Sequence, residues 1–177
     1  MSAAPRSRPR SVSTVGRNIN CRNENGPFSV VRSAQQFYGQ SKTADALFAV
    51  ALDSIGRRQG VRAFAVHPGG IVTDLLRHMS QTEVDGYGIL DKSGKPIIDP
   101  ENNKKTPQQG AATTVWCATS PRLNGMGGVY CEDCDIARAL PSDESQELHG
   151  VRPRAIDPVA AGRLWQLSEQ LTGVSLD

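Results

Sequence analysis

The segment 38–55, YGQSKTADALFAVALDSI, constrains the fold more than any other part of the chain. Its apolar residues recur at helical spacing and form one stripe, at positions 44, 47, 48, 51, 52 and 55. The pattern predicts a helix, and Tyr38 and Lys42 are then one turn apart near its start. We therefore expect both side chains on one face of this helix.

A tyrosine and a lysine in this arrangement suit proton transfer. A free phenol has a pKa of about 10, so it keeps its proton at neutral pH. An ammonium about 4 Å away, at an effective dielectric of about 20, favours the phenolate by on the order of 4 kcal/mol. The same spacing also arises by chance on helix faces, so the pair of Tyr38 and Lys42 does not define a site by itself.

A predicted strand and a glycine-rich turn follow the helix. Residues 61–66 are apolar apart from Arg62, which predicts a parallel strand buried on both faces. Ligands of open α/β sheets bind beyond the carboxyl ends of strands, where residues 67–74, HPGGIVTD, are then expected. Glycine lets the backbone approach a flat ring, and proline fixes the exit from the strand. The alternative is a turn that holds no ligand.

The order of these motifs resembles the second half of the short-chain dehydrogenase/reductase family. A tyrosine–lysine helix, a buried strand and then Pro-Gly-x-Ile-x-Thr follow one another here as they do in that family, and YGQSKTADALFAVAL and HPGGIVTDL look most like its retinol-dehydrogenase-like and bacterial members. The resemblance runs from about Tyr38 to Thr172. It implies the α/β class, with a partial Rossmann-like, doubly wound parallel sheet and flanking helices, in which residues 24–177 form the catalytic half.

The resemblance also implies an activity and a set of residue roles. The activity is hydride transfer between a carbonyl and an alcohol of a small-molecule substrate, with NADP or NAD as cofactor. Tyr38 is then the acid and base, and Lys42 lowers the pKa of the tyrosine and holds the nicotinamide ribose. The backbone of Ile71 meets the carboxamide, and the hydroxyl of Thr73 contacts the cofactor phosphates. The implied cofactor contacts are Tyr38, Lys42, Pro68, Gly69, Ile71 and Thr73.

The amino-terminal segment 1–23 is rich in arginine and serine and contains no acidic residue. We expect a basic, disordered arm, with a transit peptide or a start within a longer gene product as alternatives. Within it, residues 12–17, VSTVGR, resemble the family segment that carries the substrate-orienting serine. Ser13 or Thr14 then supplies the hydroxyl that orients the carbonyl; an unrelated hydroxyl in the arm is the alternative.

The glycine-rich dinucleotide motif of the family is absent from the sequence. Neither GxGxxG nor TGxxxGxG occurs, so we expect the nucleotide-binding half to be missing and cofactor binding to be weak or lost in the isolated chain. The remaining strands are expected to leave an unpaired sheet edge. The alternative function is therefore a truncated, non-catalytic remnant or interaction module. Family members often dimerise through the helix that carries the tyrosine, so the resemblance also implies a homodimer through the Tyr38 helix.

The rest of the chain offers one long loop and three further elements. Residues 75–105 lack periodicity, and in the family this region folds over the substrate. Apolar loop residues that line a pocket or pin the loop down are Leu75, Leu76, Met79, Tyr87 and Ile89. The predicted elements are a helix that opens at Thr106–Pro107, a strand over 127–131, and a helix that opens at Asp157–Pro158 and ends near Gly173.

Composition excludes several other classes of protein. With 20 basic and 18 acidic residues the net charge is +2, and nothing predicts a nucleic-acid surface. No apolar run reaches the roughly 20 residues that span a bilayer. Cys131 and Cys134 form a CxxC pair, which suits redox or metal chemistry, but no second ligand pair accompanies it. We expect no metal, reduced structural cysteines and a cytoplasmic location.

Overall fold

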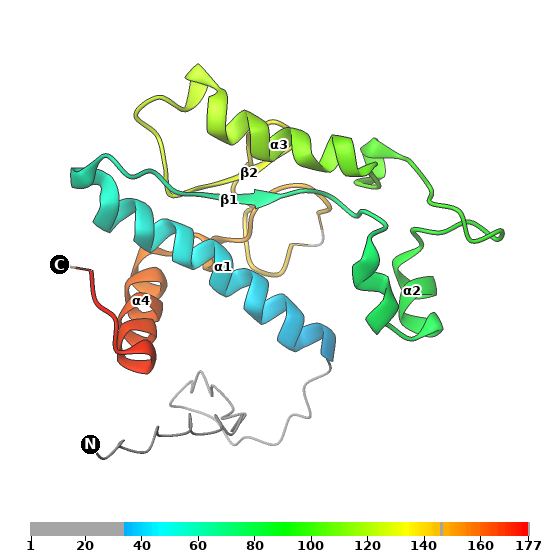
Figure 1. The fold of residues 1–177 in the computed structure, drawn as a ribbon, viewed down its shortest axis with the longest axis horizontal. Coiled ribbons are helices and arrows are strands. Elements are labelled where there is room, and N and C mark those ends of the chain that lie inside the picture. The colour runs from blue at the N-terminus through cyan, green and yellow to red at the C-terminus, as the bar shows by residue number, and fades with distance from the viewer. Residues whose placement is uncertain (1–33, 146, 177) are drawn as a thin grey trace, which may run out of the picture. The chain divides into compact units, whose positions relative to one another are not determined.

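The computed structural model of the protein describes residues 34–145 and 147–176 (Figure 1). The amino-terminal segment 1–23, with Ser13, Thr14 and Cys21, lies outside the described residues, so the predictions made for it remain predictions.

The described residues form one small mixed sheet. Strand β1 (Phe64–His67) pairs in parallel with β2 (Val129–Glu132), and β2 pairs antiparallel with β3 (Asp135–Ile136). The register of the parallel pair runs from Phe64 opposite Val129 to His67 opposite Glu132. The α/β class is confirmed, and the predicted parallel pairing is present between β1 and β2, whereas β3 makes the sheet a mixed one. Only the two-residue turn of Asp133 and Cys134, both at positive φ, separates β3 from β2. A connection this short can join antiparallel strands but not parallel ones.

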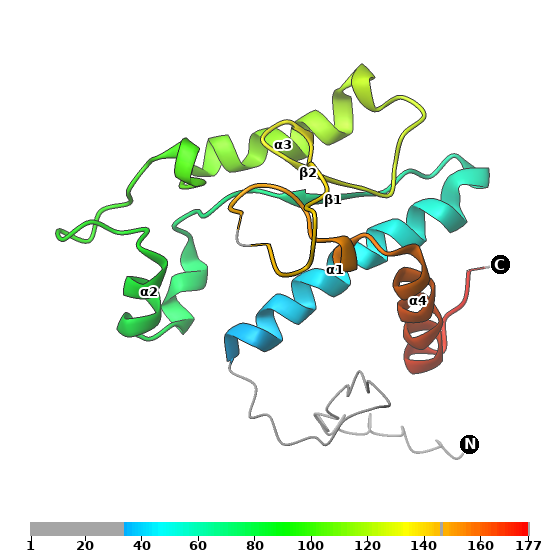
Figure 2. The same ribbon diagram turned by 180° about the vertical axis from the view of Figure 1, so that it is seen from behind.

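Helices cover both faces of the strands. Figures 1 and 2 show α3 (Pro107–Thr119) on one side of β1 and β2, and α1 (Ala34–Gly56) with α4 (Pro158–Thr172) on the other. The short helix α2 (Gln81–Tyr87) lies at one end, in the segment that follows β1. This layering of helices on a parallel strand pair is compatible with a partial Rossmann-like fold. No helix within residues 34–145 and 147–176 has the length and apolar character needed to cross a membrane.

The buried face of α1 differs from the predicted stripe. Its buried positions are Ala46, Ala49, Ala51, Asp53 and Gly56. Two residues of the stripe remain exposed, Phe48 at 41% and Ile55 at 36%. Phe48 instead stacks on Trp165 of α4, with ring centroids 4.9 Å apart. The prediction was wrong here because close packing against the strands selects small side chains, while large apolar ones cover the neighbouring helix.

Asp53 fastens α1 to the segment that leads into β1. Its side chain is only 3% exposed and accepts hydrogen bonds from Arg62 Nε at 2.8 Å, Arg62 Nη2 at 3.3 Å, Ala63 N at 3.2 Å and Arg57 Nη2 at 3.3 Å. Burial raises the pKa of Asp53, but the hydrogen bonds from Arg62, Ala63 and Arg57 outweigh it and hold this pKa below its ordinary value. The predicted strand began at position 61, whereas β1 begins at Phe64. Residues 62 and 63 instead donate hydrogen bonds to the carboxylate of Asp53.

Local signals set the helix ends. Thr106 and Gln109 form the predicted capping box of α3, and Asp157 caps α4. The predicted loop 75–105 instead contains a 3-10 helix over Asp74–His78 as well as α2. Sequence reasoning missed α2, although its capping box of Ser80 and Glu83 was a visible signal.

Candidate functional site

Tyr38 and Lys42 lie together on one face of α1. The Nζ of Lys42 is 5.7 Å from the centre of the Tyr38 ring, so the ammonium lies within range of a cation–π contact. Tyr38 is 49% exposed, which leaves its phenol open to a ligand. The juxtaposition expected from helical spacing is therefore present.

Asp45 is a partner of Lys42 that sequence reasoning missed. Its Oδ2 lies 2.8 Å from Lys42 Nζ. The hydrogen bond and the negative charge of Asp45 raise the pKa of Lys42 above its ordinary value. Lys42 therefore keeps its positive charge throughout the neutral pH range. The i,i+3 spacing of Lys42 and Asp45 in the sequence was a signal that could have predicted this ion pair.

The turn after β1 is sealed against the segment 103–105. Gly70 N donates to Asn103 O at 2.7 Å, and Lys105 N donates to Gly70 O at 2.9 Å. Gly69 has a φ of +90°, and a Cβ there would lie 2.8 Å from Cδ of Lys105 and 3.0 Å from Oδ1 of Asn103. Only glycine fits at this position, so the turn has one fixed shape. Pro68 precedes it and is exposed.

Ile71 and Thr73 point in different directions from this turn. A Cβ on Gly110 of α3 would lie 2.0 Å from Cδ1 of Ile71, so the Ile71 side chain fills the notch that this glycine leaves. Thr73 is exposed and caps the 3-10 helix that follows, where its Oγ1 accepts from Leu75 N at 3.4 Å. The hydroxyl of Thr73 acts there as an acceptor, so its proton stays available to a ligand oxygen.

A polar cluster around the buried Lys105, behind the turn, was not predicted. The side chain of Lys105 is only 6% exposed and forms an ion pair with Asp133, whose Oδ2 lies 3.4 Å from His149 Nδ1. His67 Nδ1 lies 3.5 Å from Asn103 Nδ2. Burial lowers the pKa of His67, against the charge of Glu132, which raises it, so this imidazole is neutral near pH 7. Lys105 thus ties the turn after β1 to the turn after β2. No pattern in the neighbouring sequence predicts this link.

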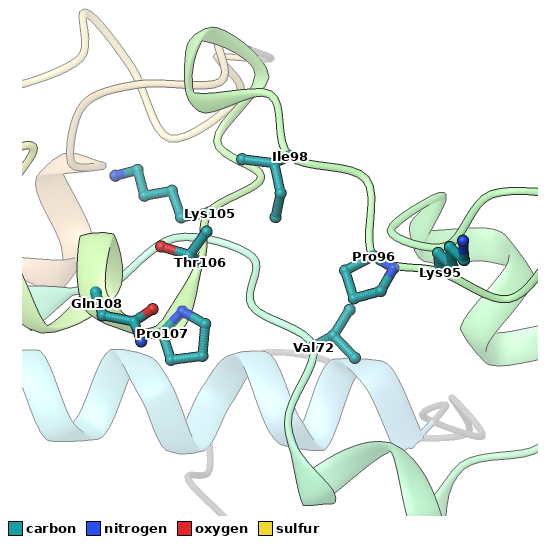
Figure 3. A pocket seen from close by; sticks show the side chains of 8 residues that line it. All are labelled: Val72, Lys95, Pro96, Ile98, Lys105, Thr106, Pro107 and Gln108. Carbon is teal, nitrogen blue, oxygen red and sulfur yellow. The ribbon is translucent and has the colours of Figure 1, made fainter.

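A pocket of about 430 Å³ opens beside the turn. Its lining residues are Val72, Lys95, Pro96, Ile98, Lys105, Thr106, Pro107 and Gln108 (Figure 3). Figure 3 shows Pro96 next to Val72, Ile98 apart from them, and the amine of Lys105 directed away from all three. None of the five apolar loop residues named from the sequence lines this pocket. Of these, Ile89 is buried, whereas Leu75 and Tyr87 are about half exposed.

The three described cysteines are free thiols. Cys131 is fully buried, and burial raises its pKa to about 12. Cys134 N donates to Thr113 Oγ1 at 3.2 Å. Among residues 34–145 and 147–176, no group of three or more His, Cys, Asp or Glu side chains is arranged to hold a metal ion.

The end of α1 that carries Tyr38 and the turn after β1 lie toward the same end of the described residues. Both ribbon views place the amino-terminal end of α1 and the carboxyl end of β1 toward α2 (Figures 1 and 2). The arrangement is that of an α/β protein with a candidate ligand site at the carboxyl edge of a parallel strand pair. No protein-family model matches the chain.

Curated proteins similar to the chain identify its family. It is 44% identical to "Probable oxidoreductase" of Streptomyces lividans over 133 residues, which are 73% of the chain and 42% of that protein. It is 32% identical to "Short-chain dehydrogenase/reductase prx1" of Penicillium roqueforti over 163 residues, 92% of the chain and 44% of that protein. "WW domain-containing oxidoreductase" of Danio rerio is 36% identical over 134 residues, 76% of the chain and 27% of that protein. The protein belongs to the short-chain dehydrogenase/reductase family, and it spans less than half the length of these relatives.

Proposed function

We propose that the protein is an NAD(P)-dependent oxidoreductase that interconverts a carbonyl and an alcohol, with Tyr38 as acid and base. The observation that carries the proposal is the position of the Lys42 ammonium, 5.7 Å from the centre of the Tyr38 ring. Family membership and the names of the relatives support the oxidoreductase class. The exposed phenol has the access to substrate that proton transfer requires.

The residues around the turn after β1 fit the nicotinamide end of such a cofactor. The exposed hydroxyl of Thr73 has a proton to donate to an anionic oxygen, and Gly69, whose Cβ position is filled by Lys105 and Asn103, fixes the shape of the turn that carries it. Lys42 would hold the ribose. When bound, the cofactor supplies the hydride. The sequence contains no glycine-rich turn of the kind that binds the cofactor pyrophosphate, so no such turn holds the adenosine end of the cofactor.

In this proposal the chain's own residues move one proton. During reduction, Tyr38 Oη gives its proton to the carbonyl oxygen as the carbon accepts the hydride, and the resulting phenolate is stabilised by Lys42. During oxidation the same oxygen takes the proton back. Asp45 shares the ammonium of Lys42, at 2.8 Å, and so weakens its action on Tyr38. Asp45 therefore tunes the pair rather than taking part in proton transfer.

A titration with NADPH tests whether the chain holds the cofactor. We expect saturable enhancement of nicotinamide fluorescence, weakened at least about tenfold in Lys42→Ala because a charged contact to the ribose is lost. Lys92→Ala removes an exposed lysine from the segment after α2 and is the matched control, with unchanged affinity expected. If wild-type protein shows no saturation at millimolar NADPH, the proposal fails and a non-catalytic interaction module becomes the better description.

An interaction role has one feature of α1 in its favour. Phe37 is 57% exposed, and Phe48 and Ile55 on the same helix are also exposed. We propose self-association through this helix as a property of either function, and sedimentation velocity at two protein concentrations measures it.

A further inference from the structure

A second hollow, of about 200 Å³, lies between α1 and the strap, which we define as residues 137–145 and 147–155. From α1 it is lined by Lys42 and Thr43, and from the strap by Glu147, Arg152 and Arg154. The proposed function makes no use of the strap, and Lys42 is the residue that it shares with this hollow.

The strap is fixed to the sheet, so the hollow is preformed. Within the strap, Leu140 N donates to Val151 O at 2.9 Å and Val151 N to Arg138 O at 2.9 Å, and Ala137 N joins it to β2 by donating to Tyr130 O at 2.9 Å. Gly150 N donates to the buried carboxylate of Glu132 at 2.6 Å. Leu140 and Val151 are each only 5% exposed. A wall held in this way keeps its side chains in place without a ligand.

The charge along the hollow is positive in surplus. Glu147 is its acidic residue, and its carboxylate is already paired with Arg138. Lys42 is shared with Asp45. Among the described residues, neither Arg152 nor Arg154 has a carboxylate within ion-pair distance. Neither guanidinium group on this wall is thus in an ion pair; the carboxylate of Asp143 accepts from the backbone Arg154 N at 3.0 Å.

Arg152 also has a donor with no acceptor. Its Nη2 donates to Ser145 O at 3.1 Å, whereas its Nε is buried and has no hydrogen-bond partner. Buried N–H groups are almost always hydrogen-bonded in native proteins, and those without a partner point to an unseen water or ion. Guanidinium N–H groups match the oxygens of carboxylates and phosphates. The Nε of Arg152 is therefore an unused donor of a guanidinium group at the hollow, and an oxyanion is a matching acceptor for such a group.

We propose that this hollow binds a small oxyanion group, a carboxylate or a phosphate, through Arg152 and Arg154. Its volume of about 200 Å³ is below the roughly 300–1,000 Å³ of sites that take whole drug-sized ligands, so it accepts an anionic group and not a complete dinucleotide. The proposal does not rest on the proposed function, because it concerns binding alone.

Titration of the ¹⁵N-labelled full chain tests this site. Inorganic phosphate is added in one series and acetate in another, with sodium chloride keeping the ionic strength constant, and the arginine Nε–Hε resonances are followed. We expect one of these resonances to shift saturably, with the preferred anion distinguishing phosphate from carboxylate chemistry. Arg152→Gln removes that resonance, and Arg154→Gln weakens affinity about tenfold, since each loses a charge-assisted contact.

Arg163→Gln is the matched control, because Arg163 is an exposed arginine on α4 without an ion pair among the described residues. Its affinity for the anion is expected to stay at the wild-type value. Linear shifts that do not saturate at millimolar anion overturn the proposal, as does an equal loss in Arg163→Gln. If circular dichroism shows that Arg152→Gln is misfolded, the exposed Arg154→Gln decides: unchanged affinity in that variant also overturns the proposal.

Discussion

Replacing Asp53 by asparagine is expected to lower the free energy of unfolding by about 2–4 kcal/mol. The carboxylate is 3% exposed, and Arg62, which donates two hydrogen bonds to it, is 24% exposed, so most of the loss comes from that pair. Arg57 is 62% exposed and contributes little, because water replaces its contact. Asparagine keeps the shape but removes the charge, and its NH₂ group faces donors where an acceptor is needed.

Urea unfolding near pH 7, followed by tryptophan fluorescence, measures this loss. Asp45→Asn on the same helix is the control: its aspartate is 67% exposed, so a change of less than about 1 kcal/mol is expected. Because folding lowers the pKa of Asp53, its contribution is complete above the ordinary aspartate pKa of about 3.9 and is lost as the pH falls through the lower native value. The reasoning is refuted if Asp53→Asn costs no more than Asp45→Asn.

Three further substitutions or labels test the site and its support. Gly69→Ala forces a side chain into a φ of +90° and should lower the free energy of unfolding in urea by about 1–3 kcal/mol. Gly39→Ala, which has open space at its Cβ, should be neutral or stabilising. Equal effects of the two substitutions would contradict the fixed shape of the turn after β1. Lys105→Met removes the buried partner of Asp133 and should weaken NADPH binding, because Lys105 supports the turn after β1. Lys105→Arg should restore part of the NADPH affinity. Unchanged NADPH affinity in Lys105→Met would show that Lys105 does not support the cofactor site. Iodoacetamide near pH 8 should leave Cys131 unlabelled until urea unfolds the chain, since burial raises its pKa to about 12; mass spectrometry showing native labelling would contradict this.

Features of the fold that depend on neighbouring residues were predictable from the sequence. The capping box of Thr106 and Gln109 and the cap at Asp157 mark helix starts because a side chain a few residues away satisfies a free N–H group. The spacing of Tyr38 and Lys42 likewise follows from helix geometry alone. The order of helix, strand and glycine-rich turn then led to the correct family.

Features that depend on distant residues were not predictable. Lys105 meets Asp133 across 28 positions, and nothing near either residue marks the pair. The buried face of α1 was misjudged because hydrophobicity favours Phe48 and Ile55, while close packing against the strands selects alanine, glycine and a fully hydrogen-bonded aspartate. Strand β3 is only two residues long, Asp135–Ile136, too short for any periodic pattern.

Comparing Tyr38→Phe with Tyr87→Phe tests the central claim most directly. Both tyrosines are about half exposed, but only Tyr38 has an ammonium beside its ring among the described residues. The rate of NADPH oxidation over a panel of aliphatic and aromatic aldehydes and ketones is measured together with NADPH affinity. The account predicts activity in wild type, its loss by roughly 10²–10⁴-fold in Tyr38→Phe at nearly unchanged NADPH affinity, and no loss in Tyr87→Phe. Full activity in Tyr38→Phe, or none in wild type, would contradict it.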